Sequence, residues 1–343
     1  MSDQPWAQVD LERLRRARRL CLFAHYHQDA VVAEHVLRYL HALGAAGFTV
    51  LVLSTSPLPD AECAKLRAVG AEVALRENRG MDFGGWIEAC LELFPIEAEL
   101  LLLANDSVYA PLGDLPAFVE TLVDTEADFY GALESLEVAP HLQSWFVLLR
   151  PAAYTSDAFA ALMRTPMPEM GSKLALVLRY EIGLTRNLAA AGLRYHAAFT
   201  LAGRAGIAGA LPYNPAHLLW RALIEAGVPF LKIEALRLNL MRIGDIGQWR
   251  DVVARHAPDM VAPIEADIAR RGMARRPGVL LMSRSRPIYW PELRPLILAD
   301  YRAGRTRSRL LLALSRTVIA AMWAPRWGIA KAIGARMKLQ RRG

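Results

Sequence analysis

The sequence has few cysteines, lacks any long apolar run and lacks acidic residues near its basic end. Its three cysteines, Cys21, Cys63 and Cys90, form no Cys-x-x-Cys pair. That spacing excludes the usual zinc sites and favours reduced thiols packed in a core. No stretch reaches about 18 apolar residues, so we expect no membrane-spanning helix. The polar residues 1–10 and the short apolar run Leu20–Ala24 also argue against a signal peptide.

The positive charge of the chain is concentrated in one segment. Residues 302–343 contain eleven Lys and Arg and no Asp or Glu, which leaves 30 basic and 34 acidic groups in residues 1–301. A mildly acidic body does not suit nucleic acid, so we expect no nucleic-acid partner. The basic, apolar segment with Trp323 and Trp327 predicts an amphipathic region that lies on an anionic membrane surface. A basic helix docked on the body is the alternative.

Apolar runs and helical periodicity alternate along the first 150 residues, a pattern typical of an α/β fold with a mostly parallel sheet. The predicted strands are Leu20–Ala24, Phe48–Leu53, Glu72–Leu75, Glu99–Ala104, Asp128–Leu133 and Ser144–Leu149. The predicted helices between them are Ala30–Leu43, Asp60–Val69, Gly85–Phe94 and Asp114–Val123. Helices then dominate, at Asp157–Met163, Lys173–Arg179, Gly183–Ala191 and His217–Ala226, with Ala197–Tyr213 as a loop.

The same pattern predicts four segments. These are a basic N-terminal helix over 1–17, one α/β domain over 18–240, a helical extension over 241–301, and a basic amphipathic tail over 302–343. In open α/β sheets, ligands bind outside the carboxyl ends of the strands. The residues that follow each predicted strand are therefore the candidates for chemistry.

The first predicted strand is followed by His25 and Tyr26. An aromatic ring and a polar group at a strand end can stack on a base and hydrogen-bond to it. Alternatively, this loop only caps the next helix through Asp29. Both interpretations remain open from these residues alone.

The third predicted strand is followed by a stretch dense in arginine and glycine, from Arg76 to Trp86. Arg76 and Arg79 can pair with a diphosphate, and Asp82 can accept a hydrogen bond from a ribose or sugar hydroxyl. Gly80 and the glycines after it permit a close backbone approach, although their spacing is not the Gly-x-Gly-x-x-Gly of dinucleotide-binding folds. A turn with a capping aspartate and a buried tryptophan is the alternative.

The most apolar predicted strand leads into Asn105, Asp106 and Ser107. A carboxylate at the end of a buried strand is costly unless it serves a function. Nucleotide-sugar enzymes place acidic residues at this point, often as Asp-x-Asp, to hold a divalent cation that neutralises the departing diphosphate. Here only Asp106 is acidic, so a metal ligand and a capping or turn aspartate both remain open.

Three later segments carry further candidates. His141 and Trp145 flank a predicted strand and could line a sugar site, although Trp145 in isolation suits a core. Glu181 begins a predicted helix, where it could deprotonate an acceptor hydroxyl or only satisfy the helix dipole. Lys232 could meet a phosphate or lie in solvent.

Taken in order, these motifs resemble the rhamnan synthesis protein F family of bacterial polysaccharide and lipopolysaccharide assembly. The resemblance covers about residues 20–240 and depends on short stretches in a specific order. They are His25-Tyr26, Arg76-Glu77-Asn78 with Gly80 and Asp82-Phe83-Gly84, Asn105-Asp106-Ser107-Val108-Tyr109, His141-Leu142-Gln143-Ser144, Tyr180-Glu181-Ile182-Gly183-Leu184, and Asn214-Pro215 with Trp220 and Pro229-Phe230-Leu231-Lys232.

The resemblance implies a GT-A-like nucleotide-sugar-binding fold and a glycosyltransferase with a dTDP-rhamnose-like donor and a lipid-linked polysaccharide or lipopolysaccharide acceptor. It implies Glu181 as the acceptor-activating base and Asp106 as a second catalytic residue and a ligand of Mg²⁺ or Mn²⁺. The implied donor-binding residues are His25, Tyr26, Arg76, Asn78, Arg79, Gly80, Asp82, Asn105, Ser107 and Lys232. The implied acceptor-binding residues are His141, Gln143 and Trp145.

For such an enzyme, we expect inversion in a single displacement and a cytoplasmic location, peripheral at the inner face of the cytoplasmic membrane. The rival hypothesis is a non-catalytic carbohydrate- or nucleotide-sugar-binding subunit of a polysaccharide assembly complex. The incomplete Asp-x-Asp favours that rival, whereas the dense loop from Arg76 to Trp86 argues against it. A nucleotide-binding regulator is a third hypothesis.

Overall fold

An eight-stranded sheet forms the centre of the computed structural model, which describes residues 5–135, 139–165, 176–200, 214–239 and 244–272. Its strands lie in the order β3-β2-β1-β4-β8-β6-β7, and β9 also pairs with β6. Their bounds are β1 Arg19–His25, β2 Thr49–Ser54, β3 Glu72–Leu75, β4 Leu100–Asn105, β6 Phe129–Ser135, β7 His141–Leu142, β8 Phe146–Leu149 and β9 Tyr195–Phe199.

The first four strands of this sheet are parallel. Cys21 of β1 lies level with Val50 of β2 and with Leu102 of β4, and β2 pairs in the same direction with β3. β8 runs antiparallel between β4 and β6, and β9 runs parallel to β6. β1 and β4 are buried along almost their whole length, which explains their continuous apolar runs. The predicted mostly parallel sheet is confirmed.

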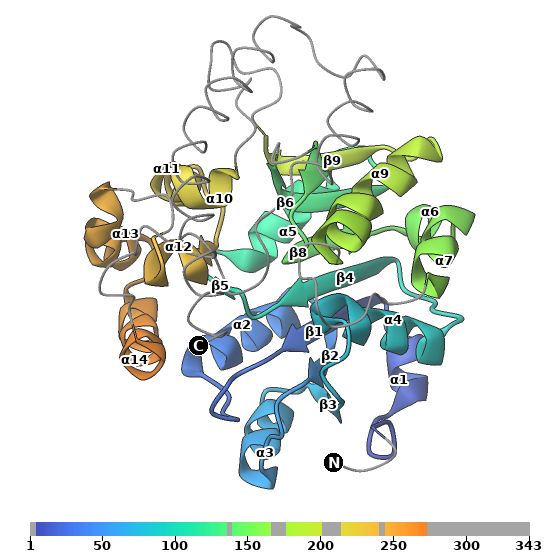
Figure 1. Cartoon of the computed structure of the whole chain (residues 1–343), viewed down its shortest axis with the longest axis horizontal. Helices are drawn as coiled ribbons and strands as arrows, with labels where there is room; N and C mark the ends of the chain where they lie inside the picture. Colours follow the sequence, from blue (N-terminus) through green and yellow to red (C-terminus); the bar gives the residue numbers. More distant parts are fainter. Residues whose placement is uncertain (1–4, 136–138, 166–175, 201–213, 240–243, 273–343) are drawn as a thin grey trace, which may run out of the picture.

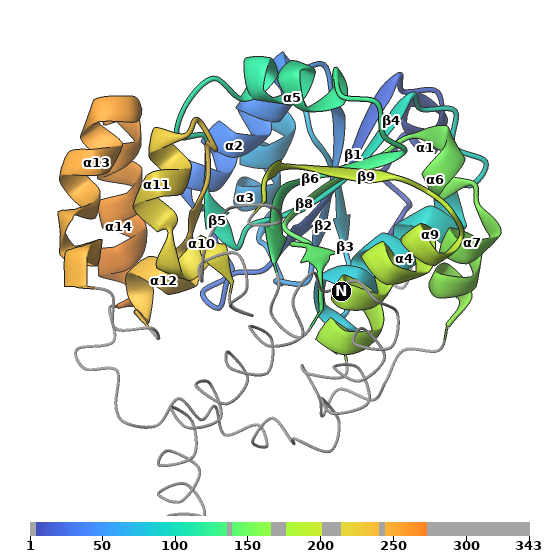
Figure 2. The same ribbon diagram turned by 90° about the horizontal axis from the view of Figure 1, so that it is seen from above.

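Helices cover both faces of the sheet (Figure 1). One face packs against α2 (Glu34–Ala45), α3 (Asp60–Ala68) and α5 (Leu115–Val123). The other face packs against α1 (Leu11–Arg15), α4 (Met81–Leu93), α6 (Pro151–Tyr154), α7 (Asp157–Arg164), the π-helical turn η1 (Val177–Glu181) and α9 (Ile182–Ala190). Figure 2 shows the strands between α2 and α5 on one side and α4 and α9 on the other. All three cysteines are buried and free, as predicted.

A helical unit over 214–239 and 244–272 stands at one side of the sheet in both views (Figures 1 and 2). It contains α10 (Pro215–Leu218), α11 (Trp220–Glu225), α12 (Ile233–Arg237), η3 (Gly244–Gln248), α13 (Trp249–His256), η4 (Pro258–Met260) and α14 (Val261–Arg271). The two-stranded pairing of β5 (Val108–Tyr109) with β10 (Leu231–Lys232) joins this unit to the end of β4. Tyr109, Trp220 and Trp249 share its separate apolar core.

Several predicted boundaries differ from the structure. The helix expected from Gly85 begins at Met81, because Gly80 adopts a left-handed conformation at the N-cap. The segment from Ala197, predicted as a loop, begins as the end of strand β9, because it pairs with β6. The predicted helix from Lys173 and the tail 302–343 lie partly or wholly outside the described residues. None of the helices in the described ranges is long and apolar enough to cross a membrane.

Candidate active site at the carboxyl edge of the sheet

Asp106 ties together the carboxyl ends of the two central strands. Its backbone nitrogen donates to the carbonyl oxygen of Ala24 at 3.2 Å. Its carboxylate accepts a hydrogen bond from the backbone nitrogen of Tyr26 at 3.1 Å. Adjacent parallel strands end at the same edge, so the segments after β1 and β4 meet there.

Asn105 connects three other groups at this edge. Its amide nitrogen donates to the Asp82 carboxylate at 2.7 Å, and its amide oxygen accepts from the Ser107 hydroxyl at 2.6 Å. The Ser107 hydroxyl in turn accepts from the ammonium of Lys232 at 2.9 Å. One asparagine thus links the start of α4, the end of β4 and the short strand β10.

Asp82 and Asp106 are carboxylates that burial makes costly to ionise. Burial raises the pKa of Asp82 to about 6, and the neighbouring charges of Asp106 and Glu181 act in the same direction. Burial also raises the pKa of Asp106 to about 6, partly opposed by the hydrogen bond from Tyr26 and the charge of Arg271. Perturbed carboxyl groups gathered at the ligand-binding edge of a sheet mark a candidate functional site.

The loop before α4 is held by an ion pair. The guanidinium of Arg76 is 4 % exposed and donates to both oxygens of the Glu88 carboxylate, at 2.7 and 2.8 Å. It also donates to the carbonyl oxygen of Arg79 at 2.9 Å. Arg76 therefore builds the loop, and its bidentate face is taken by Glu88 and not free for a diphosphate. Asn78 and Arg79 are exposed, and Arg79 pairs with Glu77 at 2.6 Å.

Two glycines permit this loop. Gly80 has a φ of 72°, in the left-handed region that glycine adopts without strain. A Cβ on Gly84 would lie 1.7 Å from the carbonyl oxygen of Arg79, so any side chain there would displace the loop. Together they let the chain turn tightly into α4 and present Asp82 in its first turn.

A second network surrounds Glu181, the last residue of η1. Its carboxylate accepts hydrogen bonds from the Ser144 hydroxyl at 2.5 Å and from the Gln143 amide at 3.2 Å. The Nε2 atom of His141 lies 3.4 Å from the same carboxylate. The amide oxygen of Gln143 accepts from Asn214, at 2.8 Å.

The two effects on Glu181 oppose each other. Burial alone would raise the pKa of Glu181, but hydrogen bonding and charge from His141 and the hydrogen bond from Ser144 hold it below its ordinary value. Glu181 is therefore ionised at neutral pH, and its carboxylate is fixed in direction by its partners. A π-helical turn, a feature frequent at functional sites, places it there.

The three aromatic candidates differ in exposure: Tyr26 lies on the surface, whereas His25 and Trp145 are buried. Tyr26 is 50 % exposed beside Asp106, so its ring is available to stack on a base. His25 is 2 % exposed; its Nδ1 lies 3.0 Å from the Ser54 hydroxyl, and burial lowers its pKa to about 4. Trp145 is 3 % exposed and packs against Phe230, with ring centroids 4.9 Å apart. It offers no open ring face, so we withdraw it from the acceptor site.

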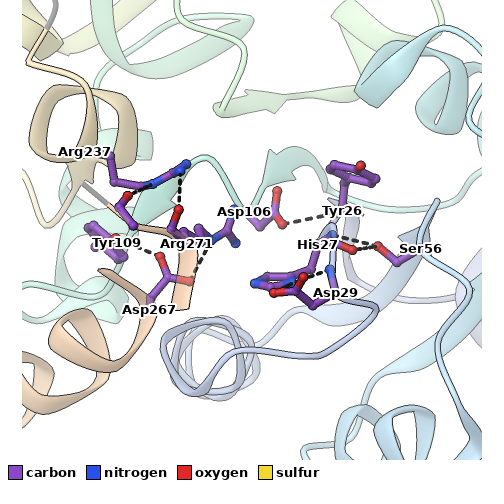
Figure 3. A network of polar contacts seen from close by, with 10 residues as sticks. Tyr26, His27, Asp29, Ser56, Asp106, Tyr109, Arg237, Asp267 and Arg271 are labelled. Atoms are coloured by element: carbon purple, nitrogen blue, oxygen red, sulfur yellow. Dashed lines mark hydrogen bonds and ion pairs between the residues drawn. The ribbon is translucent and has the colours of Figure 1, made fainter. Parts of the chain in front are cut away.

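One group at this edge comes from a region in which the sequence showed no motif. Arg271, at the end of α14, reaches toward Asp106 and the segment after β1 (Figure 3). Its Nε donates to Asp267 at 2.7 Å, and Asp267 accepts from the Tyr109 hydroxyl at 2.8 Å. An aspartate four residues before an arginine is an ordinary helical pair in sequence, so nothing singled it out.

The fold and the site define an α/β protein whose sheet gathers acidic, amide and cationic side chains at its carboxyl edge. The family model of rhamnan synthesis protein F matches residues 50–264, so the chain belongs to that family.

A curated relative is the uncharacterized protein y4gN of Sinorhizobium fredii (strain NBRC 101917 / NGR234), 25 % identical over 167 residues. The match covers 47 % of this chain and 43 % of the relative, so the chain spans less than half of that protein.

Solved structures with partial similarity include three proteins. S. aureus TarS 1-349 has a TM-score of 0.36 at 12 % identity, covering 83 % of this chain and 80 % of its own. A cytidylyltransferase from Leptospira borgpetersenii serovar Hardjo-bovis (strain JB197) has 0.34 at 12 %, covering 52 % and 75 %. The glycosyltransferase GlyE of Streptococcus pneumoniae TIGR4 has 0.33 at 14 %, covering 53 % and 45 %.

Proposed function

We propose that this chain is a glycosyltransferase that moves a sugar from a nucleotide-sugar donor to a glycan acceptor. The observation that carries the proposal is a cluster centred on Asp82. Its carboxylate accepts a hydrogen bond from the Asn105 amide and lies within electrostatic reach of Asp106, Glu181 and Lys232, which come from three other segments. The charges of Asp106 and Glu181 both raise the pKa of Asp82, yet of the three carboxylates only Glu181 is stabilised in its charged form. Membership of the rhamnan synthesis protein F family supports a rhamnose-bearing donor and a lipid-linked polysaccharide or lipopolysaccharide acceptor.

The donor side of this site lies at the ends of β1 and β4. The exposed ring of Tyr26 stacks on the base, and Asp82 accepts from a ribose or sugar hydroxyl. The ammonium of Lys232, beside Ser107, lies where it can offset the charge that develops on the departing diphosphate. Asn105 positions Asp82 and Ser107 and need not touch the donor itself.

A divalent cation is part of the proposal. Mg²⁺ is usually held by one or two carboxylates, with substrate phosphates and water completing its shell. Asp106 and Asp82 fit that requirement, because each is a half-buried carboxylate with a raised pKa. Across the described ranges, no three His, Cys, Asp or Glu side chains are grouped as metal ligands. The ion, Mg²⁺ or Mn²⁺, would neutralise charge on the leaving group.

Glu181 acts as the general base on the acceptor side. Its fixed, ionised carboxylate takes the proton from an acceptor hydroxyl while that oxygen bonds to the anomeric carbon. The bond from the anomeric carbon to the phosphate oxygen breaks, and the nucleoside diphosphate leaves with that electron pair. A single displacement of this kind inverts the anomeric configuration. His141 and Gln143 hold Glu181 in place.

The basic segment 302–343 lies outside the described residues. We propose that it attaches the enzyme to anionic lipid at the inner face of the cytoplasmic membrane, near a lipid-linked acceptor. Deleting 302–343 should abolish sedimentation with anionic vesicles and leave hydrolysis of a soluble donor intact. Unchanged sedimentation would contradict the attachment.

A non-catalytic sugar-binding subunit is the second candidate. The observation that favours it is that Asn105-Asp106-Ser107 contains one carboxylate where Asp-x-Asp has two, and that the amide of Asn105 is bound to Asp82. Donor turnover separates the two candidates. Purified protein is incubated with dTDP-rhamnose, UDP-glucose or GDP-mannose, with and without Mn²⁺, and release of nucleoside diphosphate is measured.

Release from one donor, lost in Glu181→Gln and Asp106→Asn, would support the transferase. Asp124→Asn is the matched control, because Asp124 is an exposed carboxylate at the end of α5, away from the site. Glycan or nucleotide-sugar binding without any turnover would instead support the subunit.

A further inference from the structure

We propose that Arg271 binds the diphosphate of the donor, so that the helical unit over 214–239 and 244–272 completes a donor site built mainly by the sheet. This inference rests on the proposed nucleotide-sugar function and adds to it a residue from a region where neither the sequence nor the family resemblance indicated a site.

Hydrogen bonds fix both the side chain and the backbone of Arg271. Its Nε donates to Asp267, whose other oxygen accepts from the Tyr109 hydroxyl. Its backbone carbonyl accepts from the guanidinium of Arg237 at 3.2 Å. Tyr109 lies three residues after Asp106 on the same segment, so the hydrogen-bond chain joins α14 directly to the candidate site.

The outer part of the guanidinium has no hydrogen-bond partner among the residues that the structure describes. The side chain is 14 % exposed, and one terminal nitrogen, Nη2, is buried without a hydrogen-bond partner in the described part of the chain. A buried N–H group without a hydrogen-bond acceptor costs free energy, and such groups in a folded protein call for an explanation. Asp267 takes only the Nε, so the terminal nitrogens remain available for a ligand.

The guanidinium points into the candidate site. Figure 3 shows it directed toward Asp106 and His27, away from the helical core. Its charge lowers the pKa of Asp106, His25 and His27, which places all three within its electrostatic reach. Asp106 does not neutralise it: among the described residues, the only ion pair of Arg271 within 4 Å is with Asp267.

The chemistry of this group matches a diphosphate. A guanidinium is always charged and presents its donors as a planar fork that fits phosphate oxygens. Arg271 reaches the edge from α14, and Lys232 reaches it from β10, so the site has two cations from two elements. Two separate cations suit a ligand with two adjacent phosphates. His25 and His27 add no further positive charge to the site, because burial lowers the pKa of both imidazoles and keeps them neutral at pH 7.

A purely structural arginine is the competing explanation. Basic residues in the last turn of a helix favour its dipole, and Arg271 occupies such a position together with Arg270. On that explanation Arg271 would only fasten α14 to Tyr109 through Asp267. The two explanations differ in whether the loss of the fork affects phosphate binding without affecting the fold.

The test measures binding of dTDP, UDP and GDP, and of the matching nucleosides, by titration calorimetry on the whole chain. Three variants are compared with the wild type: Arg271→Gln, Arg271→Lys and, as a matched control, Arg270→Gln, which changes the exposed neighbour on the same turn. Melting temperature and circular dichroism report on folding for each protein.

We expect Arg271→Gln to weaken the preferred nucleoside diphosphate by about 10- to 100-fold while binding of the nucleoside is unchanged. Arg271→Lys keeps the charge and loses the planar fork, so its affinity should lie between those of the wild type and Arg271→Gln. Arg270→Gln should bind like the wild type. If Arg271→Gln lowers the melting temperature, Arg271→Lys decides: wild-type affinity in that folded variant overturns the proposal of a fork on phosphate.

The outcomes separate this inference from the proposed function. If the wild type binds a nucleoside diphosphate and a folded Arg271→Gln binds it equally well, the role of Arg271 is overturned and the donor site stands. If the wild type binds no nucleoside diphosphate, both proposals fail.

Discussion

The two sides of the candidate site treat their carboxylates in opposite ways. Asp82 and Asp106 together receive one side-chain amide and one backbone N–H, and burial raises the pKa of both to about 6. Glu181 receives a hydroxyl and an amide and lies beside His141, and its pKa is held below the ordinary value. Burial raises the pKa on both sides, so the difference comes from hydrogen bonding and neighbouring charge rather than from burial.

The contrast shows what each side is suited to receive. A pair of poorly satisfied carboxylates is stabilised by an arriving positive charge, which on the donor side is a divalent cation bound with phosphate. A well-satisfied carboxylate stays ionised and fixed in direction, which suits a base that must meet one hydroxyl. Substitutions on each side test this division of roles.

Removing the charge of Glu181 should have the largest effect. Glu181→Gln keeps the size and the contact to Gln143 but removes the base, so we expect the transfer rate to fall by about 10²- to 10⁴-fold. Donor affinity should change little, because the donor lies on the other side. Steady-state kinetics would show the loss in kcat. A comparable loss of donor binding would show that Glu181 also binds the donor, which contradicts the proposed separation of the two sides.

Disturbing the loop before α4 should displace Asp82 and so weaken donor binding. Gly84→Ala would place a Cβ against the carbonyl oxygen of Arg79, so the loop must move together with Asp82. We expect a loss of about 2–4 kcal/mol in unfolding free energy and loss of donor binding. Urea denaturation and calorimetry measure the two effects. Gly44→Ala is the matched control, because a Cβ on that helical glycine meets nothing within 4 Å.

Neutralising Asp106 should make the protein more stable. Its raised pKa means that the folded state holds the proton more tightly, so its contribution to stability is lost as pH rises from about 4 through about 6. Asp106→Asn should therefore raise the unfolding free energy at pH 8 by about 1 kcal/mol while activity is lost. At pH 4 the gain should vanish. A loss of stability at pH 8 would show that hydrogen bonds and neighbouring charges stabilise the ionised carboxylate of Asp106 in the folded protein.

Weakening the partners of Glu181 should have the smallest effect. Ser144→Ala removes one hydrogen bond to the carboxylate, so the pKa of Glu181 should rise toward its ordinary value. Because the base must be deprotonated, the acid limb of the pH–rate profile should move to higher pH. At pH 8 the rate should fall less than about tenfold. An unmoved acid limb would assign that limb to another group, such as Asp82.

Much of this site could be predicted from sequence because parallel strands carry their following residues to one edge. Tyr26 and Asp106 meet for that reason, and the apolar runs predicted the ends of β1 and β4 to within one residue. The meeting of Asn105 with Asp82 also follows, since β3 and β4 end at the same edge.

Other features had no sequence signal. The sequence predicted Arg76 as a phosphate ligand, but Glu88, in the α4 helix that follows the loop, takes its bidentate face. Trp145 suited either a sugar site or a core, and only the packing with Phe230 decides. Arg271 depends on α14 folding back to Tyr109, a contact across 158 residues between Tyr109 and Asp267. Such tertiary pairings leave no periodicity in the chain.

Donor turnover by the wild type and by Glu181→Gln under the same conditions tests most directly whether Glu181 is the base of a transferase. We predict that the wild type releases nucleoside diphosphate from one nucleotide-sugar, and that Glu181→Gln binds this donor with similar affinity but turns it over at least about 100-fold more slowly. Equal turnover in the two proteins would contradict the assignment of the base. Donor binding with no turnover by the wild type would contradict the enzyme itself.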